Sequence, residues 1–265
     1  TVTFTLTDTT GGSLSVGSAV TNSAGEAQTI YTASSATSAE DGVIVTGRVK
    51  DTALQTETTL TVSGRALSMI IGTGNDIIES NEGTTYTKVY TLIVRDSSGA
   101  GVPDQTANIG ILSTHFYKGF LVPGTTHWFR PANAPRCEAE DQDSDGVLDV
   151  GEDVNTDGEL TPGGVAIVAP GTVTTDETGV ATFEVIYPQD HAMWAEADIT
   201  ATATVAGTES LQTAIFDFPA SAEDLTVDGS PPNPDSPWGT ANGAFDTTTG
   251  TVTFDPAPGT CANTD

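Results

Sequence analysis

The sequence predicts an all-β protein made of two β-sandwich modules in tandem, and three observations support this fold class. Threonine and valine dominate the periodic segments, and both are β-branched residues that suit a pleated, half-buried strand. Apolar residues alternate with polar ones, as at Val2, Phe4 and Leu6, which threonines separate. Turns rich in glycine, asparagine and aspartate recur about every 8–12 residues, which is the spacing of strands in a sandwich.

The first module is expected over residues 1–64. Its opening strand is residues 2–6, and the pair Gly11 and Gly12 turns the chain after it. Later strands are expected at residues 27–31, 43–49 and 60–62.

The second module, residues 65–218, repeats the first. The matching segments are Thr21–Ala27 with Thr175–Ala181, Val45–Thr46 with Ile199–Thr200, and Leu54–Thr56 with Leu211–Thr213. Leading strands at residues 67–71 and 88–94 have no match in the first module, so its sheet edges are expected to be open. Open edges permit self-association, and a filament assembled by strand exchange is one hypothesis. The alternative is that the boundary of the sequence falls inside the module.

Two further regions depart from the repeat. A long insertion at about residues 115–164 interrupts the second module, and insertions of that length are usually functional or disordered. Residues 219–265 form a Pro-rich, extended tail with a hairpin expected at residues 243–254. Cys137 and Cys261 lie outside any C-x-x-C motif, so we expect a disulfide that ties the tail back to the insertion. Two unrelated buried thiols are the alternative.

Several segments carry a family resemblance. They are Val2–Asp8, Ala19–Asn22 with Gly25 and Ala27, and Val89–Val94 followed by Asp96–Pro103. They resemble the bacterial Ig-like domains of group 1, which form the extracellular rods of invasin- and intimin-type surface proteins. The match covers roughly residues 1–64 and 67–218 without the insertion, although Ile109-Gly110-Ile111 stands where the family has V-T-F. The resemblance implies Ig-like sandwiches in a bacterial cell-surface or secreted protein without enzymatic activity.

The sharpest chemical signal is an acidic loop at residues 141–152. Its oxygen donors follow the D-x-D-x-D-G spacing of calcium loops, and Gly146 at the sixth position permits the sharp turn. The ligands expected are Asp141, Asp143, Asp145, the carbonyl of Val147, Asp149 and Glu152. Ca²⁺ takes six to eight oxygens, whereas Mg²⁺ suits a crowded protein cage poorly. The alternative is an acidic loop that binds no metal.

A second copy of the loop begins at residue 153. Asp153, Asn155 and Asp157 occupy its first, third and fifth positions, but Gly164 stands where the bidentate acid belongs. Glu159 is the expected substitute; otherwise this site is weak or vacant. Both loops resemble those of dockerins and thrombospondin type 3 repeats as much as an EF-hand.

Aromatic residues gather just before the acidic loops: Phe116, Tyr117, Phe120, Trp128 and Phe129. One interpretation is a surface that binds a glycan or a protein, as in an adhesin. The other is a small core that covers the side of the sandwich, and this one is favoured.

Composition excludes several functions. The net charge is −28, from 8 basic and 36 acidic residues, so the chain lacks the basic surface that nucleic acids and anionic lipids require. No apolar run approaches the roughly 18–20 residues that span a bilayer. No nucleophile elbow, P-loop, HExxH or dinucleotide motif is present, so we expect no enzyme.

Overall fold

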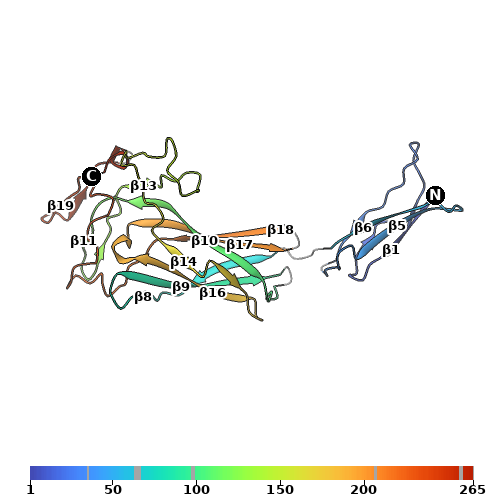
Figure 1. Cartoon of the computed structure of the whole chain (residues 1–265), viewed down its shortest axis with the longest axis horizontal. Helices are drawn as coiled ribbons and strands as arrows, with labels where there is room; N and C mark the ends of the chain where they lie inside the picture. Colours follow the sequence, from blue (N-terminus) through green and yellow to red (C-terminus); the bar gives the residue numbers. More distant parts are fainter. Residues whose placement is uncertain (35, 63–66, 97–98, 206–207, 257–258, 265) are drawn as a thin grey trace. The chain divides into compact units, whose positions relative to one another are not determined.

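The computed structural model describes residues 1–34, 36–62, 67–96, 99–205, 208–256 and 259–264, and it confirms the all-β prediction (Figure 1). The helices among these residues are two short 3₁₀ turns, η1 (Gln189–His191) and η2 (Gly259–Ala262). No helix in the described part of the chain is long and apolar enough to cross a membrane.

The chain divides into two compact units. Unit 1 comprises Thr1–Ser68, Arg95–Ala100 and Thr204–Ser210, and unit 2 comprises Met69–Val94, Gly101–Ala203 and Leu211–Asp265.

Unit 1 contains one antiparallel sheet and one separate strand pair. The sheet has the order β3-β1-β5-β6, formed by β3 (Ser18–Ala19), β1 (Val2–Thr7), β5 (Val43–Val49) and β6 (Gln55–Leu60). The separate pair is β2 (Ser13–Leu14) with β4 (Tyr31–Thr32).

Unit 2 contains two larger antiparallel sheets. The first runs β14 (Ile167–Ala169), β16 (Val180–Pro188), β9 (Thr85–Arg95) and β7 (Ser68–Thr73), with β8 (Ile78–Glu79) also on β9. The second runs β13 (Arg136–Glu138), β10 (Thr106–Tyr117), β17 (Ala195–Val205) and β18 (Thr208–Phe216), with β15 (Thr172–Thr174) also on β10.

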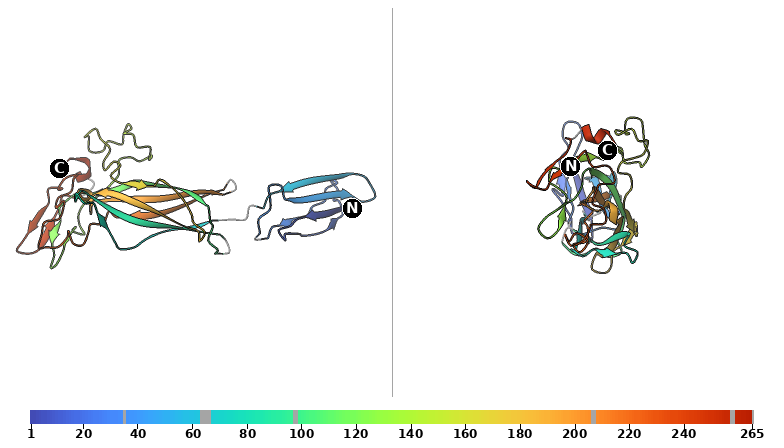
Figure 2. Two further views of the ribbon diagram at one scale, coloured as in Figure 1. Left: turned by 60° about the horizontal axis from the view of Figure 1, so that its bottom comes forward. Right: turned by 90° about the vertical axis from the view of Figure 1, so that its left-hand side faces the viewer.

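The two sheets of unit 2 pack face to face (Figure 2), and aromatic side chains of both sheets meet between them. Phe216 of one sheet stands edge-on to Tyr90 and Tyr187 of the other, with ring centroids 6.2 and 5.1 Å apart. Leu92 and Ile199 are fully buried between them. Inward residues alternate with outward ones along β9 and β16, as a two-layer sandwich requires.

The C-terminal residues pack on unit 2. The Tyr187 hydroxyl donates to the carbonyl of Pro219 at 2.6 Å, and the Trp194 indole N–H donates to the carbonyl of Asn233 at 3.2 Å. The hairpin expected at residues 243–254 is present as β19 (Ala244–Asp246) paired with β20 (Thr251–Thr253). The Pro-rich stretch therefore covers one end of the sandwich.

Candidate metal centre

The acidic loops leave the sandwich at the end of β13 and project beside the C-terminal segment (Figures 1 and 2). Residues 139–164 are all described and contain turns and bends but no strand. Two hydrogen bonds fix the ends of this segment to β10: the Ala139 N–H donates to the carbonyl of Thr114 at 2.9 Å, and the Ser113 hydroxyl donates to the carbonyl of Gly163 at 2.7 Å. Both ends of the acidic segment are thus attached to neighbouring residues of β10.

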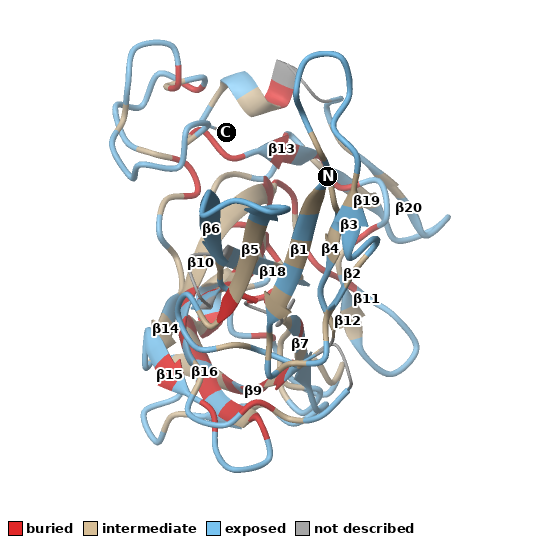
Figure 3. Cartoon of the chain, turned by 90° about the vertical axis from the view of Figure 1, so that its right-hand side faces the viewer, coloured by how far each residue is buried: buried red, intermediate tan, exposed pale blue. Residues whose placement is uncertain are grey.

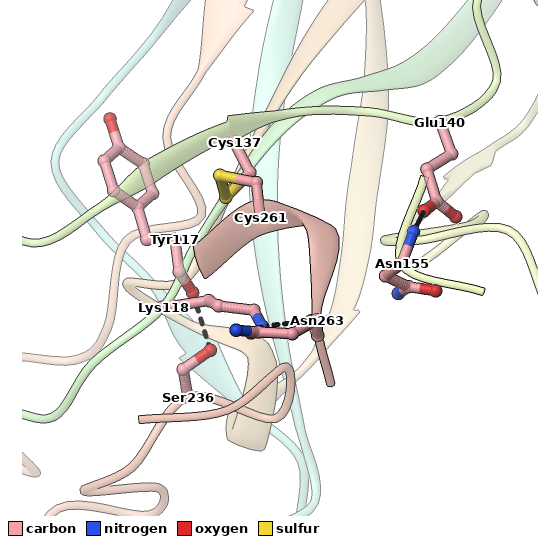
Figure 4. The surroundings of a disulfide bond; sticks show 8 residues. All are labelled: Tyr117, Lys118, Cys137, Glu140, Asn155, Ser236, Cys261 and Asn263. Atoms are coloured by element: carbon pink, nitrogen blue, oxygen red, sulfur yellow. Dashed lines mark hydrogen bonds between the residues drawn. A yellow bond between two sulfur atoms is a disulfide. The ribbon is translucent and has the colours of Figure 1, made fainter. Parts of the chain in front are cut away.

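The predicted disulfide is confirmed (Figure 4). Cys137 of β13 is bonded to Cys261 of η2, with Cα atoms 5.6 Å apart. Beside it, the buried ammonium of Lys118 donates to the side-chain oxygen of Asn263 at 3.1 Å. The Ser236 hydroxyl donates to the carbonyl of Tyr117 at 2.6 Å. The tail is therefore anchored next to the point where the acidic loops begin.

The first loop brings its leading carboxylates together. One oxygen each of Asp141, Asp143 and Asp145 lies within 4.8 Å of the others. Asp141 accepts the backbone N–H groups of Asp145 and Gly146, both at 3.1 Å. Asp145 in turn accepts the N–H of Val147 at 2.8 Å. These bonds wind the loop around its first aspartate, so that the oxygens converge.

Glu152 closes the first loop from its twelfth position. Its side chain is buried and accepts the N–H groups of Gln142 at 3.0 Å and Asp149 at 2.9 Å. The bonds from Asp149 and Gln142 hold the pKa of Glu152 below its ordinary value. Loss of solvation and the nearby charges of Asp145 and Glu152 raise the pKa of Asp143. The side chains of Val147 and Asp149 are exposed.

The second loop repeats the backbone conformation of the first. Asp153 accepts the N–H of Gly158 at 3.2 Å, and Asp157 accepts the N–H of Glu159 at 2.8 Å. Both loops carry left-handed backbone at positions four and six: φ is 68° and 76° at Ser144 and Gly146, and 61° and 83° at Thr156 and Gly158. Glycine adopts this region without steric cost, which explains the glycine at position six of each loop.

Glu140 supplies the acid that the sequence of the second loop lacks. It is only 2% exposed, and its Oε1 accepts the N–H groups of Val154 at 3.0 Å and Asn155 at 3.1 Å. Its Oε2 accepts the N–H of Thr161 at 2.9 Å. Glu159, the substitute expected from the sequence, is exposed, whereas Glu140 is buried and makes these bonds.

Oxygens of Glu140, Asp153 and Asp157 lie within 4.8 Å of one another, so this acidic cluster could hold a metal ion. Asn155 is buried beside it; its amide donates to Asp157 at 2.9 Å and to the Thr161 hydroxyl at 3.1 Å.

The two loops are therefore related reciprocally. Glu140 immediately precedes the first loop and closes the second, whereas Glu152 immediately precedes the second loop and closes the first. Each glutamate accepts N–H groups from the second and ninth positions of the loop that it closes. A sequence signal for Glu140 exists: the repeated unit is E-D-x-[DN]-x-D-G, which begins one residue before the calcium-loop pattern.

The loops carry a large negative charge that no lysine or arginine within them balances. The carboxylates concerned are Glu140, Asp141, Asp143, Asp145, Asp149, Glu152, Asp153, Asp157 and Glu159. No lysine or arginine follows Arg136 in the sequence, and no described Lys or Arg forms an ion pair with these groups. Oδ1 of Asp153 is buried and has no hydrogen-bond partner among the described residues. Buried carboxylates in proteins are generally paired with cations or bound to metals.

Most of the aromatic residues named above pack within the chain. Phe116 is buried against Trp238, with ring centroids 5.4 Å apart, and Phe120 packs on Phe254 at 5.3 Å. The guanidinium of Arg130 lies 3.4 Å from the ring centre of Tyr117.

Trp128 donates its indole N–H to the carbonyl of Gly229 at 3.0 Å, whereas Phe129 is 47% exposed. The packing of Phe116, Tyr117 and Phe120 supports the small-core interpretation over a ligand-binding surface.

The loop pair thus offers two clusters of hard oxygen donors: Glu140 belongs to the second cluster, whereas Glu152 accepts backbone N–H groups of the first loop without belonging to the first cluster. The ligand chemistry fits a divalent cation, since no sulfur and no histidine lies in either cluster. Comparisons with known proteins add no further assignment: no family model matches the chain, and no curated protein matches its sequence.

Proposed function

We propose that this chain is a non-catalytic structural segment of an extracellular protein, whose second unit is rigidified by two calcium ions bound in the paired loops. The observation that carries the proposal is the reciprocal placement of Glu140 and Glu152. An acidic loop without a metal function has no need of a buried carboxylate that approaches it from outside its own sequence.

The first ion would be held by Asp141, Asp143, Asp145 and Glu152. The second would be held by Glu140, Asp153, Asn155 and Asp157. Calcium fits better than magnesium, because clustered carboxylates without a rigid octahedral frame suit the flexible coordination of the larger ion.

The chain's own residues determine what the ions would do. The loops begin and end at β10, through Thr114 and Ser113, and the disulfide at Cys137 joins the same region to the tail. Calcium supplies charge that offsets the repulsion among the carboxylates. Binding would therefore order residues 139–164 and stiffen the end of unit 2 to which the tail is fixed.

An extracellular location is part of the proposal. The disulfide fits an oxidising compartment, where millimolar calcium is also available to weak loop sites. The resemblance to bacterial surface rods supports a place in a cell-surface spacer.

The test is thermal unfolding and amide hydrogen exchange with calcium and with a chelator. Calcium is expected to raise the melting temperature and to protect amides in residues 139–164, and Asp145→Ala is expected to reduce both effects. Glu177→Gln, a change to an exposed acid far outside the loops, serves as the control and should respond to calcium like the unmodified chain. Unchanged melting and exchange across a calcium titration of the unmodified chain would refute the proposal.

A further inference from the structure

Lys118 is the most deeply buried of the basic residues that the structure describes. Its side chain is 1% exposed, although lysine is rarely buried so completely in proteins. It follows the last residue of β10, and its Nζ donates to Oδ1 of Asn263 at 3.1 Å and also to the backbone carbonyl of Asn263 (Figure 4). A primary amine and a carboxamide, 145 residues apart in the sequence, therefore meet where the amine has little access to water.

The segment around β13 positions both residues. The N–H of Lys118 donates to the carbonyl of Pro135 at 3.0 Å. Two residues further along, Cys137 is bonded to Cys261, which lies two residues before Asn263. Figure 3 shows the buried centre of β13, and the disulfide attaches η2 to that point. The amine and the carboxamide are thus held together before any reaction, which lowers the entropy cost of joining them.

The distance between the reacting atoms is short. The carboxamide carbon of Asn263, Cγ, is bonded to Oδ1 at about 1.23 Å. It therefore lies at most about 4.3 Å from Nζ of Lys118. Groups poised to react stand roughly 3–3.5 Å apart. A displacement of no more than about 1 Å brings the amine within reach of this carbon.

Lys88 provides a comparison within the same unit. It is also buried, at 8% exposed, and its Nζ donates to the backbone carbonyl of Gly74 at 2.8 Å. Among the described residues, no side-chain carboxamide is a hydrogen-bond partner of Lys88. The chain therefore contains one buried lysine that faces an asparagine side chain and one that does not.

We propose that Lys118 and Asn263 are joined by an intramolecular isopeptide bond. Nζ attacks Cγ, so that the Nζ–Cγ bond forms and the bond from Cγ to Nδ2 breaks. Of the three hydrogens on the ammonium of Lys118, one stays on the new secondary amide and two pass to Nδ2, which leaves as ammonium. Atoms and charge balance, nothing is oxidised or reduced, and no co-reactant is needed.

Burial favours the product. A charged group buried away from water is costly, whereas an amide is neutral. The reaction transfers the positive charge from the buried side chain of Lys118 to ammonium, which leaves for the solvent. Exclusion of water from the site also limits hydrolysis of the Asn263 side chain as a competing reaction.

The bond would give the tail a second covalent attachment, which reductants do not open. The Cys137–Cys261 disulfide would still restrict the unfolded chain, because it would close a further ring through residues 118–137 and 261–263. The tail would remain joined to unit 2 after reduction of the disulfide.

The first test is the intact mass of the oxidised full chain. The mass is expected to lie below the value calculated from the sequence with one disulfide, by the mass of one ammonia. Lys118→Met and Asn263→Ala should each have their full calculated mass. Lys88→Met, the matched change to the other buried lysine, should keep the deficit.

Digestion with trypsin after denaturation and reduction locates the bond. Without it, residues 119–136 and 137–265 are released as separate fragments, because Arg130 precedes proline and no lysine or arginine follows Arg136. With it, cleavage after Lys118 is blocked, and residues 96–136 stay joined to residues 137–265. Cleavage after Lys88 should proceed in the same digest.

Three results would overturn the proposal. One is the full calculated mass for the unmodified chain. Another is a mass deficit without the branched fragment, because the ammonia would then have been lost by ring closure within one asparagine. The third is a deficit that persists in Asn263→Ala. None of them bears on the calcium proposal, which calcium titration of the same preparations tests separately.

Discussion

Glu140 and Thr161 are joined by two hydrogen bonds, one in each direction. The N–H of Glu140 donates to the carbonyl of Thr161 at 2.8 Å, and the N–H of Thr161 donates to Oε2 of Glu140 at 2.9 Å. Thr161 is the ninth residue of the second loop, counted from Asp153. A buried acid from before the first loop is thereby fixed inside the second.

Replacement of Glu140 by glutamine is expected to destabilise the calcium-loaded protein by about 2–3 kcal/mol. The amide keeps one acceptor oxygen but places N–H groups against backbone donors, and leaving buried donors unpaired costs about 1–3 kcal/mol. Glu138→Gln changes a neighbouring exposed acid in β13 and should stay within about 0.5 kcal/mol of the unmodified chain. Urea unfolding in excess calcium measures both, and equal losses for the two variants would contradict the assigned role of Glu140.

Gly158→Ala is expected to weaken calcium binding to the second loop. The φ of Gly158 is 83°, and a left-handed conformation costs an L-residue about 1–2 kcal/mol, or roughly tenfold in affinity. Gly164→Ala is the matched control, since a Cβ there meets no atom within 4 Å and its φ is not left-handed. Calcium titration of both variants checks the prediction, which fails if both bind alike.

The carboxylate cluster of the first loop could be predicted from the sequence, because Asp141, Asp143 and Asp145 follow one another at fixed spacing and their convergence is a local property of the chain. Glu140 could not be found by that rule. It reaches Val154 and Thr161, which lie 14 and 21 residues further along, and spacing rules describe only the residues within one loop.

In the fold, too, local features could be predicted from the sequence and contacts between distant segments could not. Alternating apolar residues and repeated turns predicted the strands, and the internal repeat predicted which strands correspond. The partners of the aromatic rings were not predictable, because Phe116 and Phe120 contact Trp238 and Phe254 of the tail. Nothing local in a Pro-rich segment indicates the surface on which it packs.

Acid is expected to destabilise unit 2 through Glu196. Burial opposes ionisation of this carboxyl, but hydrogen bonds from Arg136 and Tyr117 outweigh it and lower its pKa from the ordinary value of 4.5. A group whose pKa is lower in the folded state stabilises above its unfolded pKa and loses that contribution as the pH falls through its folded pKa. The free energy of unfolding should therefore decline below about pH 4.5, and less steeply in Glu196→Gln. Denaturant titrations between pH 3 and 7 measure how steeply the free energy of unfolding depends on pH in each protein. Equal slopes for the unmodified chain and Glu196→Gln would show that Glu196 does not cause the loss of stability in acid.

The disulfide is expected to contribute about 3–5 kcal/mol to the free energy of unfolding. It links residues 124 positions apart, and the chain-entropy model gives about 4–5 kcal/mol for a loop of that length, less any strain. The double change of Cys137 and Cys261 to alanine should also accelerate amide exchange in residues 236–263. A loss below about 1 kcal/mol by urea unfolding would show that packing alone holds the tail.

Phe116→Ala and Phe129→Ala separate core packing from surface exposure in the aromatic segment. Phe116 is 2% exposed and Phe129 is 47% exposed. Removal of a buried phenylalanine typically costs about 3–5 kcal/mol, whereas the exposed ring should cost under about 1 kcal/mol. Similar losses in thermal unfolding would contradict the small core assigned to this segment.

The stoichiometry of calcium binding tests the central claim most directly. Isothermal titration of the chelator-treated chain is expected to show two ions bound per chain, and titration of Glu140→Gln is expected to show one. Binding of no ion, or of two ions with unchanged affinity after the loss of Glu140, would contradict a paired centre in which each loop is closed by the glutamate that precedes the other.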